Sequence, residues 1–413
     1  MPTIFDYFPL IRAQFFIKNL FLCNFITWSA KKQQFVPVFW SNVKYTLPLV
    51  CNTVQCATVL ARMRSLISNG PKNIFFTQII SCCLSLSNIG HWAMGMACRR
   101  KSAEITAYFN GILITHAQYS KSLPARRGVK LRLRDIISTG KCMPGDISRG
   151  EMGRFGLCIG LFTQVVPTIL LNMLVLMLPC AMPHFLRSTF PDCAANGKEF
   201  VWDFGIPTNW AWAVTLVDMF SSGYGMCLAC VAVSFVFHCG VTCVADHLKR
   251  TRNSLKLQSI LAYKQAQILT TAVNNINQVG NLPIMITDLT WVGITCFYAV
   301  IAHNSKLSVP ALLFAIVLGV DCTFASSFVI YKAGADLYQL SQDVLQNWRG
   351  RKSMLKNRYL RRMKASCNVL KIKLGSAGNF IEKATPLIIF QFSMEQVASL
   401  LLISVKEKRN LHA

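Results

Sequence analysis

The chain has 413 residues, of which 53% are apolar and only 15% are charged. A soluble chain of this length would carry about 25% charged residues, so the composition argues against a soluble globular protein and favours a membrane protein. The excess of 43 Lys and Arg over 17 Asp and Glu fits either a nucleic acid or a membrane surface as partner, and the positions of the charges decide between them.

The predicted elements begin with an apolar segment, Phe8–Trp28, that carries Arg12 and Lys18. This mixture predicts an amphipathic helix at the membrane interface. Seven stretches that could cross a bilayer follow, at about Val43–Leu60, Asn73–Cys98, Phe155–Met182, Trp210–Ala245, Ile284–His303, Val309–Tyr331 and Ala384–Val405. The predicted fold class is an all-α membrane protein with seven transmembrane helices.

The basic residues are unevenly distributed between the loops. Most of the 43 fall in residues 1–42, 99–154, 246–283 and 332–383, and the positive-inside rule places such segments in the cytosol. We therefore expect a cytosolic N-terminus and an extracellular C-terminus. The basic excess then reports topology, and no nucleic-acid partner is predicted.

Several cytosolic segments carry apolar residues at helical spacing, which predicts helices that bury one face. The stripes comprise Ile105, Tyr108, Phe109 and Ile112; Leu257, Leu261, Ile268, Ala272 and Ile276; and Leu337, Leu340 and Val344. We expect these helices to pack on one another below the membrane.

This pattern predicts five parts. They are a cytosolic N-terminal segment (1–42), a six-helix membrane region with cytosolic helical extensions (43–331), cytosolic anchor helices (332–383), a last transmembrane helix (384–405) and a short extracellular tail (406–413).

This architecture and the carboxy-terminal stretch LKIKLGSAGNFIEKATPLIIF (residues 370–390) resemble the insect-type chemoreceptor superfamily, the gustatory and odorant receptors of arthropods. Gustatory members usually carry Thr-Tyr, five apolar residues and Gln-Phe in the last helix. Here the interval from Thr385 to Gln391-Phe392 is one residue shorter. The resemblance is therefore to a divergent member, closer to the gustatory branch.

The resemblance implies a homo- or heterotetrameric, ligand-gated, non-selective cation channel in the plasma membrane, in contact with membrane lipid. The resemblance also implies a ligand pocket in the outer half of the six-helix region. From the side chains described below, we expect a small tastant or sugar-like ligand there. The last helices would line one central pore, and the cytosolic helices would anchor the subunits to one another. No cofactor and no metal are implied.

A last helix that lines a fourfold axis presents one face at a spacing of three to four residues. Val397, Leu401 and Ser404 share such a face, and Glu395 lies close by. Apolar rings can close a channel and a carboxylate ring favours cations, although Glu395 could equally hydrogen-bond to a neighbouring helix.

The outward halves of the helices supply candidates for the ligand site. They are Asp218, Tyr224 and Trp212 on the fourth span, Asn172 on the third, and Phe297 and Tyr298 on the fifth. Aromatic walls with a few polar groups suit small organic ligands. The alternative for Trp212 is a place in the interfacial aromatic belt.

Two other function classes remain open. They are a seven-helix G-protein-coupled receptor, which would need the opposite orientation, and a membrane transporter, which would often show internal repeats. The chain has no P-loop, HExxH or GxSxG motif, so we do not expect an enzyme. Cys180 and Cys193 flank the largest outer loop and could form a disulfide.

Overall fold

The computed structural model describes residues 25–29, 34–38, 46–57, 75–120, 210–249, 257–304, 309–324, 329–350, 357–375 and 378–412, with a few single residues between them. The helices are α3 (Phe75–Arg100), α4 (Ser102–Ser120), α8 (Ala211–Cys230), α9 (Gly240–Lys249), α10 (Leu257–Ile276), α11 (Leu282–His303), α12 (Val309–Phe324), α13 (Lys332–Gly350), α14 (Arg358–Ala365) and α15 (Thr385–His412). Two π-helical segments, η3 (Val231–Cys239) and η4 (Asn277–Asn281), join α8 to α9 and α10 to α11.

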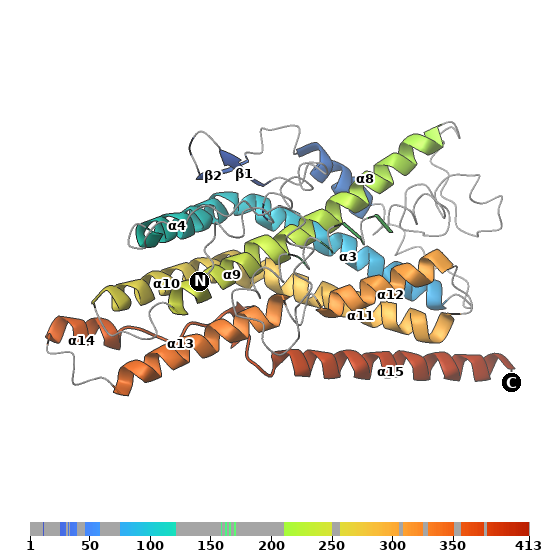
Figure 1. Cartoon of the computed structure of the whole chain (residues 1–413). Helices are drawn as coiled ribbons and strands as arrows, with labels where there is room; N and C mark the ends of the chain where they lie inside the picture. Colours follow the sequence, from blue (N-terminus) through green and yellow to red (C-terminus); the bar gives the residue numbers. More distant parts are fainter. Residues whose placement is uncertain are drawn as a thin grey trace, which may run out of the picture.

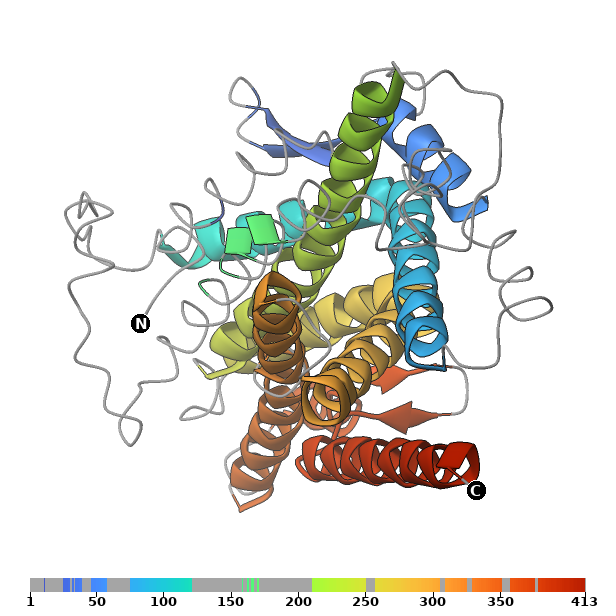
Figure 2. The ribbon, with the colours of Figure 1, turned by 90° about the vertical axis from the view of Figure 1, so that its right-hand side faces the viewer.

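Several of these helices follow one another without a loop. The stretch Trp212–Lys249 is one helix of 38 residues, about 57 Å long at 1.5 Å per residue and roughly twice the thickness of a hydrocarbon core. Lys101 links α3 to α4, because its amide donates to Ala97 and its carbonyl accepts from Ile105. The rod Trp212–Lys249 is therefore longer than a hydrocarbon core is thick, whereas α4 leaves α3 at an angle (Figure 2).

The far ends of the rods meet in a helical base made of α4, α9, α10, α13 and α14 (Figure 1). The predicted stripes of α4 and α13 are buried in it; Phe109 and Val344, for example, are fully covered. Phe109 stacks on Phe235 with ring centroids 4.3 Å apart, and Tyr263 packs against Trp348 at 5.4 Å.

Tyr263 also shows how the base satisfies its buried polar groups. Burial raises the pKa of its phenol well above the usual value, so the hydroxyl remains protonated and donates to the Asn368 carbonyl at 2.8 Å.

The stripe predicted on α10 is for the most part not the buried one. Leu257, Leu261 and Ile268 are 46%, 45% and 69% exposed. The face that enters the base is formed instead by Ile260, Tyr263, Ala266, Leu269, Val273 and Ile276. Helix α10 is apolar on two sides, and the outer stripe of Leu257, Leu261 and Ile268 lies uncovered in a single chain.

The described part of the chain is not purely helical. Strands β1 (Ile26–Ser29) and β2 (Gln34–Pro37) pair antiparallel with Trp28 opposite Phe35, so the predicted interfacial helix is wrong at its end, after Phe25. Phe35 explains the strand, because its ring packs 5.6 Å from Phe109 and its amide and carbonyl both bond to the Asn110 side chain. A second hairpin joins β3 (Lys373–Leu374) to β4 (Asn379–Phe380).

Three helices in the described ranges are long and apolar enough to cross a membrane: Trp212–Lys249, Leu282–His303 and Thr385–Lys406; the apolar helix Leu312–Thr323 is shorter. The predicted span Asn73–Cys98 corresponds to α3, whereas most of Phe155–Met182 lies outside the described residues.

Helix α15 lies at the periphery of the molecule in both views (Figures 1 and 2). Only 6% of its most apolar window is buried, against 89% for Trp212–Lys249. The helix continues to His412, through most of the segment predicted as a short extracellular tail (406–413).

Candidate functional site

A further helix covers residues 46–57, and a buried polar cluster lies between it and α8. Asp218, Ser221, Asn52 and Gln55 are all fully inaccessible to solvent. Asn52 Nδ2 donates to Ser221 Oγ at 3.2 Å, and Gln55 Nε2 lies 3.5 Å from Asp218 Oδ1. The Ser221 hydroxyl in turn donates to Gln55 Oε1. The cluster combines a carboxylate, two amides and a hydroxyl, so it can both donate and accept hydrogen bonds.

The structure distributes the six predicted ligand residues over separate places. Asp218 lies in the polar cluster and Tyr224 is buried further along α8. Trp212 is 74% exposed at the end of the rod, as an interfacial aromatic would be. Tyr298 is fully buried, 3.4 Å from His303 Nε2. Phe297 lines a cavity beside α15. Asn172, like Cys180 and Cys193, lies outside the described residues.

An ion pair between α3 and α11 is a feature that the sequence reading missed. His91 Nε2 lies 3.3 Å from Asp288 Oδ2, with both side chains about nine-tenths buried. Helix α8 closes over the imidazole, since a Cβ added to Gly225 would lie 3.1 Å from His91 Nδ1. Three helices therefore meet at this contact between a histidine and a carboxylate. In the sequence, Gly225 is the only sign of this close helix contact, and a glycine alone does not identify the helix that packs against it.

One face of helix α15 packs on its own chain, and the opposite face is exposed. Val397 is 4% exposed and lines the contact with α11. Glu395 is exposed on the opposite side, where Gln391 Nε2 donates to its carboxylate at 2.9 Å. Leu401 and Ser404 are half-buried. The predicted face of Val397, Leu401 and Ser404 is thus buried or half-buried in the single chain, whereas Glu395 lies about 200° from Val397 around the helix.

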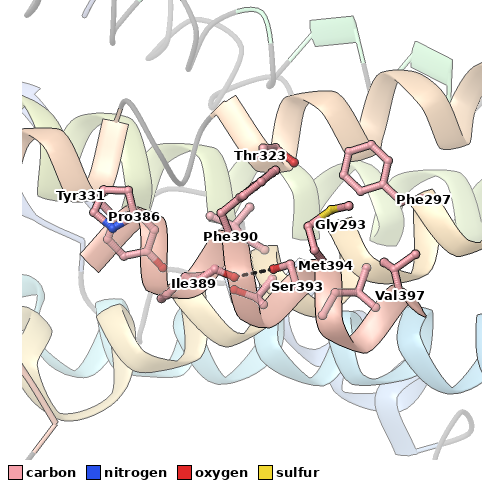
Figure 3. Close-up of a pocket in the computed structure, with 13 residues that line it drawn as sticks. Gly293, Phe297, Thr323, Tyr331, Pro386, Ile389, Phe390, Ser393, Met394 and Val397 are labelled. Carbon is pink, nitrogen blue, oxygen red and sulfur yellow. Dashed lines mark hydrogen bonds between the residues drawn. The ribbon is translucent and has the colours of Figure 1, made fainter. Parts of the chain in front are cut away.

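A cavity of about 40 Å³ separates α15 from α11 and α12 (Figure 3). Phe390 and Met394 of α15 point toward Thr323 and Phe297, and Pro386 and Tyr331 lie at its other end. This space exceeds the roughly 10–15 Å³ that one water requires. Ser393 donates to the Ile389 carbonyl at 2.8 Å, so its oxygen remains available as an acceptor.

No group of three or more His, Cys, Asp or Glu side chains in the described part of the chain is arranged to hold a metal ion. The polar cluster, the pair of His91 and Asp288, and α15 with its cavity are the candidate functional features of the described residues.

No protein-family model and no curated protein matches the chain. Two solved structures match over almost the full length. The olfactory receptor OR5 of the insect Machilis hrabei in complex with eugenol has a TM-score of 0.58 and 10% identity, over 96% of this chain and 100% of that one. The same receptor described without eugenol has a TM-score of 0.52 and 10% identity, over 95% and 99% of the two chains. The chain therefore shares the fold of this olfactory receptor.

Proposed function

We propose that the protein is a chemosensory receptor of the gustatory type that acts as a ligand-gated, non-selective cation channel in the plasma membrane. Its N-terminus and helical base would be cytosolic, and four copies would surround a pore lined by α15. The shared fold supports this proposal, and the observation that carries it is the exposure of α15.

Helix α15 cannot remain as uncovered as it is in a single chain. Leu387 and Leu402 are 72% and 71% exposed, and burying a leucine side chain is worth about 1.5–3 kcal/mol. Lipid and neighbouring copies would cover the apolar positions. The polar residues Gln391, Glu395 and Ser399 recur every four positions, so they share one side of the helix.

We place this polar side at the pore axis. Four copies of Glu395 would form a carboxylate ring that attracts cations, and an ionisable residue at membrane depth is a functional candidate by default. Val397 would hold α15 to its own subunit, whereas Leu401 and Ser404 would lie toward the edge of the lining.

The polar cluster around Asp218 is our candidate for ligand recognition. Its amides, hydroxyl and carboxylate could bond to the hydroxyl groups of a sugar-like or other small neutral ligand. Tyr224, which is buried further along α8, would be an aromatic contact for the same ligand. The bound eugenol of the olfactory receptor supports a small organic molecule as the ligand class.

Reversal potentials under bi-ionic conditions test the pore. Glu395→Gln should lower the permeability ratio of cations over chloride and the unitary conductance, because the ring loses its charge. Glu104→Gln removes an exposed carboxylate from α4 and should change neither. Unaltered selectivity and conductance in Glu395→Gln would rule out Glu395 as a pore residue.

A further inference from the structure

The segment between α14 and α15 contains the short hairpin of β3 and β4. Lys373 pairs with Phe380 and Leu374 with Asn379. Gly375 and Gly378 have φ values of 63° and 78°, which favour glycine and allow the chain to reverse. This hairpin is the covalent link that joins the base to α15.

Two amide side chains of the rod α10–η4 hold one edge of the hairpin. Asn274 Oδ1 accepts from the Lys373 amide at 3.0 Å, and Asn274 Nδ2 donates to the Lys371 carbonyl at 2.9 Å. Gln278 Nε2 donates to the Gly375 carbonyl at 2.7 Å, and the Gly375 amide donates to the Gln278 carbonyl at 3.0 Å. We call Asn274 and Gln278 the amide clamp. They are four residues apart and so lie on one side of the rod.

Helix α13 holds the hairpin on its other side. Ile381 is fully buried against Gly334, where an added Cβ would meet its side chain at 3.0 Å. The Phe380 ring lies 5.2 Å from that of Tyr338, and Lys371 Nζ lies 3.8 Å above the Phe380 ring. The hairpin is thus fixed between two helices of the base.

The rod that carries the clamp continues directly into the membrane region. Gly280 in η4 has a φ of 130°, a backbone state that favours glycine, and α11 begins at Leu282. Helix α11 contacts both α3 and α15. One rod therefore reaches α15 twice, by side-chain packing along α11 and by hydrogen bonds to the hairpin at the start of α15.

We infer that Asn274 and Gln278 are positioning residues for gating, which transmit a displacement of α10 and α11 to the start of the pore helix. This inference rests on the proposed channel function. A shift of the rod at η4 would pull the hairpin through four hydrogen bonds, so α15 would follow the base as well as its packing partner. Weakening the clamp should change how readily the pore opens and leave the pore itself unchanged.

Single-channel recording of the full chain separates these two quantities. Asn274→Ala and Gln278→Ala should each shift the agonist concentration for half-maximal response by about two- to ten-fold, as expected for the loss of one or two hydrogen bonds. Unitary conductance and reversal potential should stay at wild-type values. Asn275→Ala, at the exposed neighbouring position, is the matched control and should shift nothing.

Gln278→Glu keeps the size of the side chain and removes its donor, so it tests the clamp if an alanine variant does not reach the surface. A response of the clamp variants equal to that of Asn275→Ala, with wild-type current present, would overturn the coupling alone. Absence of any agonist-evoked current from wild-type protein at the cell surface would overturn the channel proposal as well. Hydrogen exchange on purified protein adds an independent readout, because the Lys373 amide should exchange faster in Asn274→Ala, and an unchanged rate would contradict the clamp.

Discussion

At the scale of single residues, the pair of His91 and Asp288 is the contact that we expect to tolerate substitution least. Both side chains are almost fully buried, and Gly225 of α8 leaves room for the imidazole alone. The desolvation cost of such a pair can exceed its attraction, but the loss of one partner costs much more than the loss of both. The pair therefore fixes how α3, α8 and α11 meet.

We expect His91→Leu and Asp288→Leu each to destabilise the protein by about 3–5 kcal/mol, because each variant leaves one buried polar group without its partner. The double variant should recover most of the loss. Thermal unfolding in detergent measures all three. Glu104→Leu on the exposed face of α4 is the control and should change stability by no more than about 0.5 kcal/mol. Additive effects of the two single variants would show that the pair is not coupled.

The polar cluster of Asp218 gives a second prediction for individual residues. Asp218→Asn keeps the shape of the side chain and removes its charge, so it should shift the agonist concentration for half-maximal response several-fold and leave unitary conductance unchanged. Trp212→Phe, at a 74% exposed position, should leave both unchanged. An unaltered dose–response curve in Asp218→Asn would remove the cluster from ligand recognition.

Sequence reasoning could find Asp218 and Glu395, because a carboxylate inside an apolar run is conspicuous. It could not find their surroundings. Gln55 reaches Asp218 from a helix 163 positions away in the chain, and no local pattern encodes that contact. The same limit applies to Val397, whose burial depends on where α11 lies and not on its own neighbours in sequence.

At the scale of helices and strands, small residues determine how closely the helices of the base approach one another. Gly240 of α9 faces the ring of Tyr108, and an added Cβ would lie 2.8 Å from its hydroxyl oxygen. Gly111 of α4 has room, since an added Cβ would meet Leu269 at 3.6 Å. Both glycines are helical, but the space beside them differs. The same substitution to alanine should therefore have opposite effects on stability at the two positions.

We expect Gly240→Ala to lower stability by about 1–3 kcal/mol through overpacking, because Tyr108 is buried and cannot yield. Gly111→Ala should raise stability by up to about 1 kcal/mol through its better helix propensity. Unfolding temperatures of the two purified variants measure both effects. Equal shifts of the same sign would contradict the packing described for α4 and α9.

Apolar periodicity predicted the buried faces of α4 and α13 correctly, because each has one apolar stripe. It misassigned most of α10, where residues at helical spacing occur on two sides and periodicity alone cannot rank them. The tertiary contacts select the side with Tyr263 and Val273. The hairpin of β1 and β2 also escaped prediction, since its strands are only four residues each and are stabilised by contacts with α4.

The assembly proposed for the whole molecule needs surfaces at both ends of each subunit. The outer stripe of α10 would supply one in the base, and α15 would supply the other in the membrane. Exposed apolar side chains in a watery compartment favour an interface. We therefore propose that the outer stripe makes contacts between copies of the chain.

Ile268→Glu should reduce the fraction of tetramer, because a carboxylate would enter that interface at a position that is 69% exposed in the single chain. Ile114→Glu on α4, where the isoleucine is 60% exposed, is the control for a general effect of the substitution. Mass photometry of the detergent-solubilised proteins reports the oligomer. An unchanged tetramer in Ile268→Glu would place the interface elsewhere on the base.

The π-helical segment Val231–Cys239 has a consequence for how the long rod tolerates insertions and deletions. A π turn takes one residue more than an α turn, so the segment sets the rotational phase between the outer part of the rod, with Asp218, and the part in the base, with Asp246. Deleting one residue there would rotate the two parts by about 100° relative to each other. The hydrogen bonds of the polar cluster and the packing contacts in the core of the base could then not both form. Substitutions should therefore be tolerated in this stretch far more readily than any change in its length.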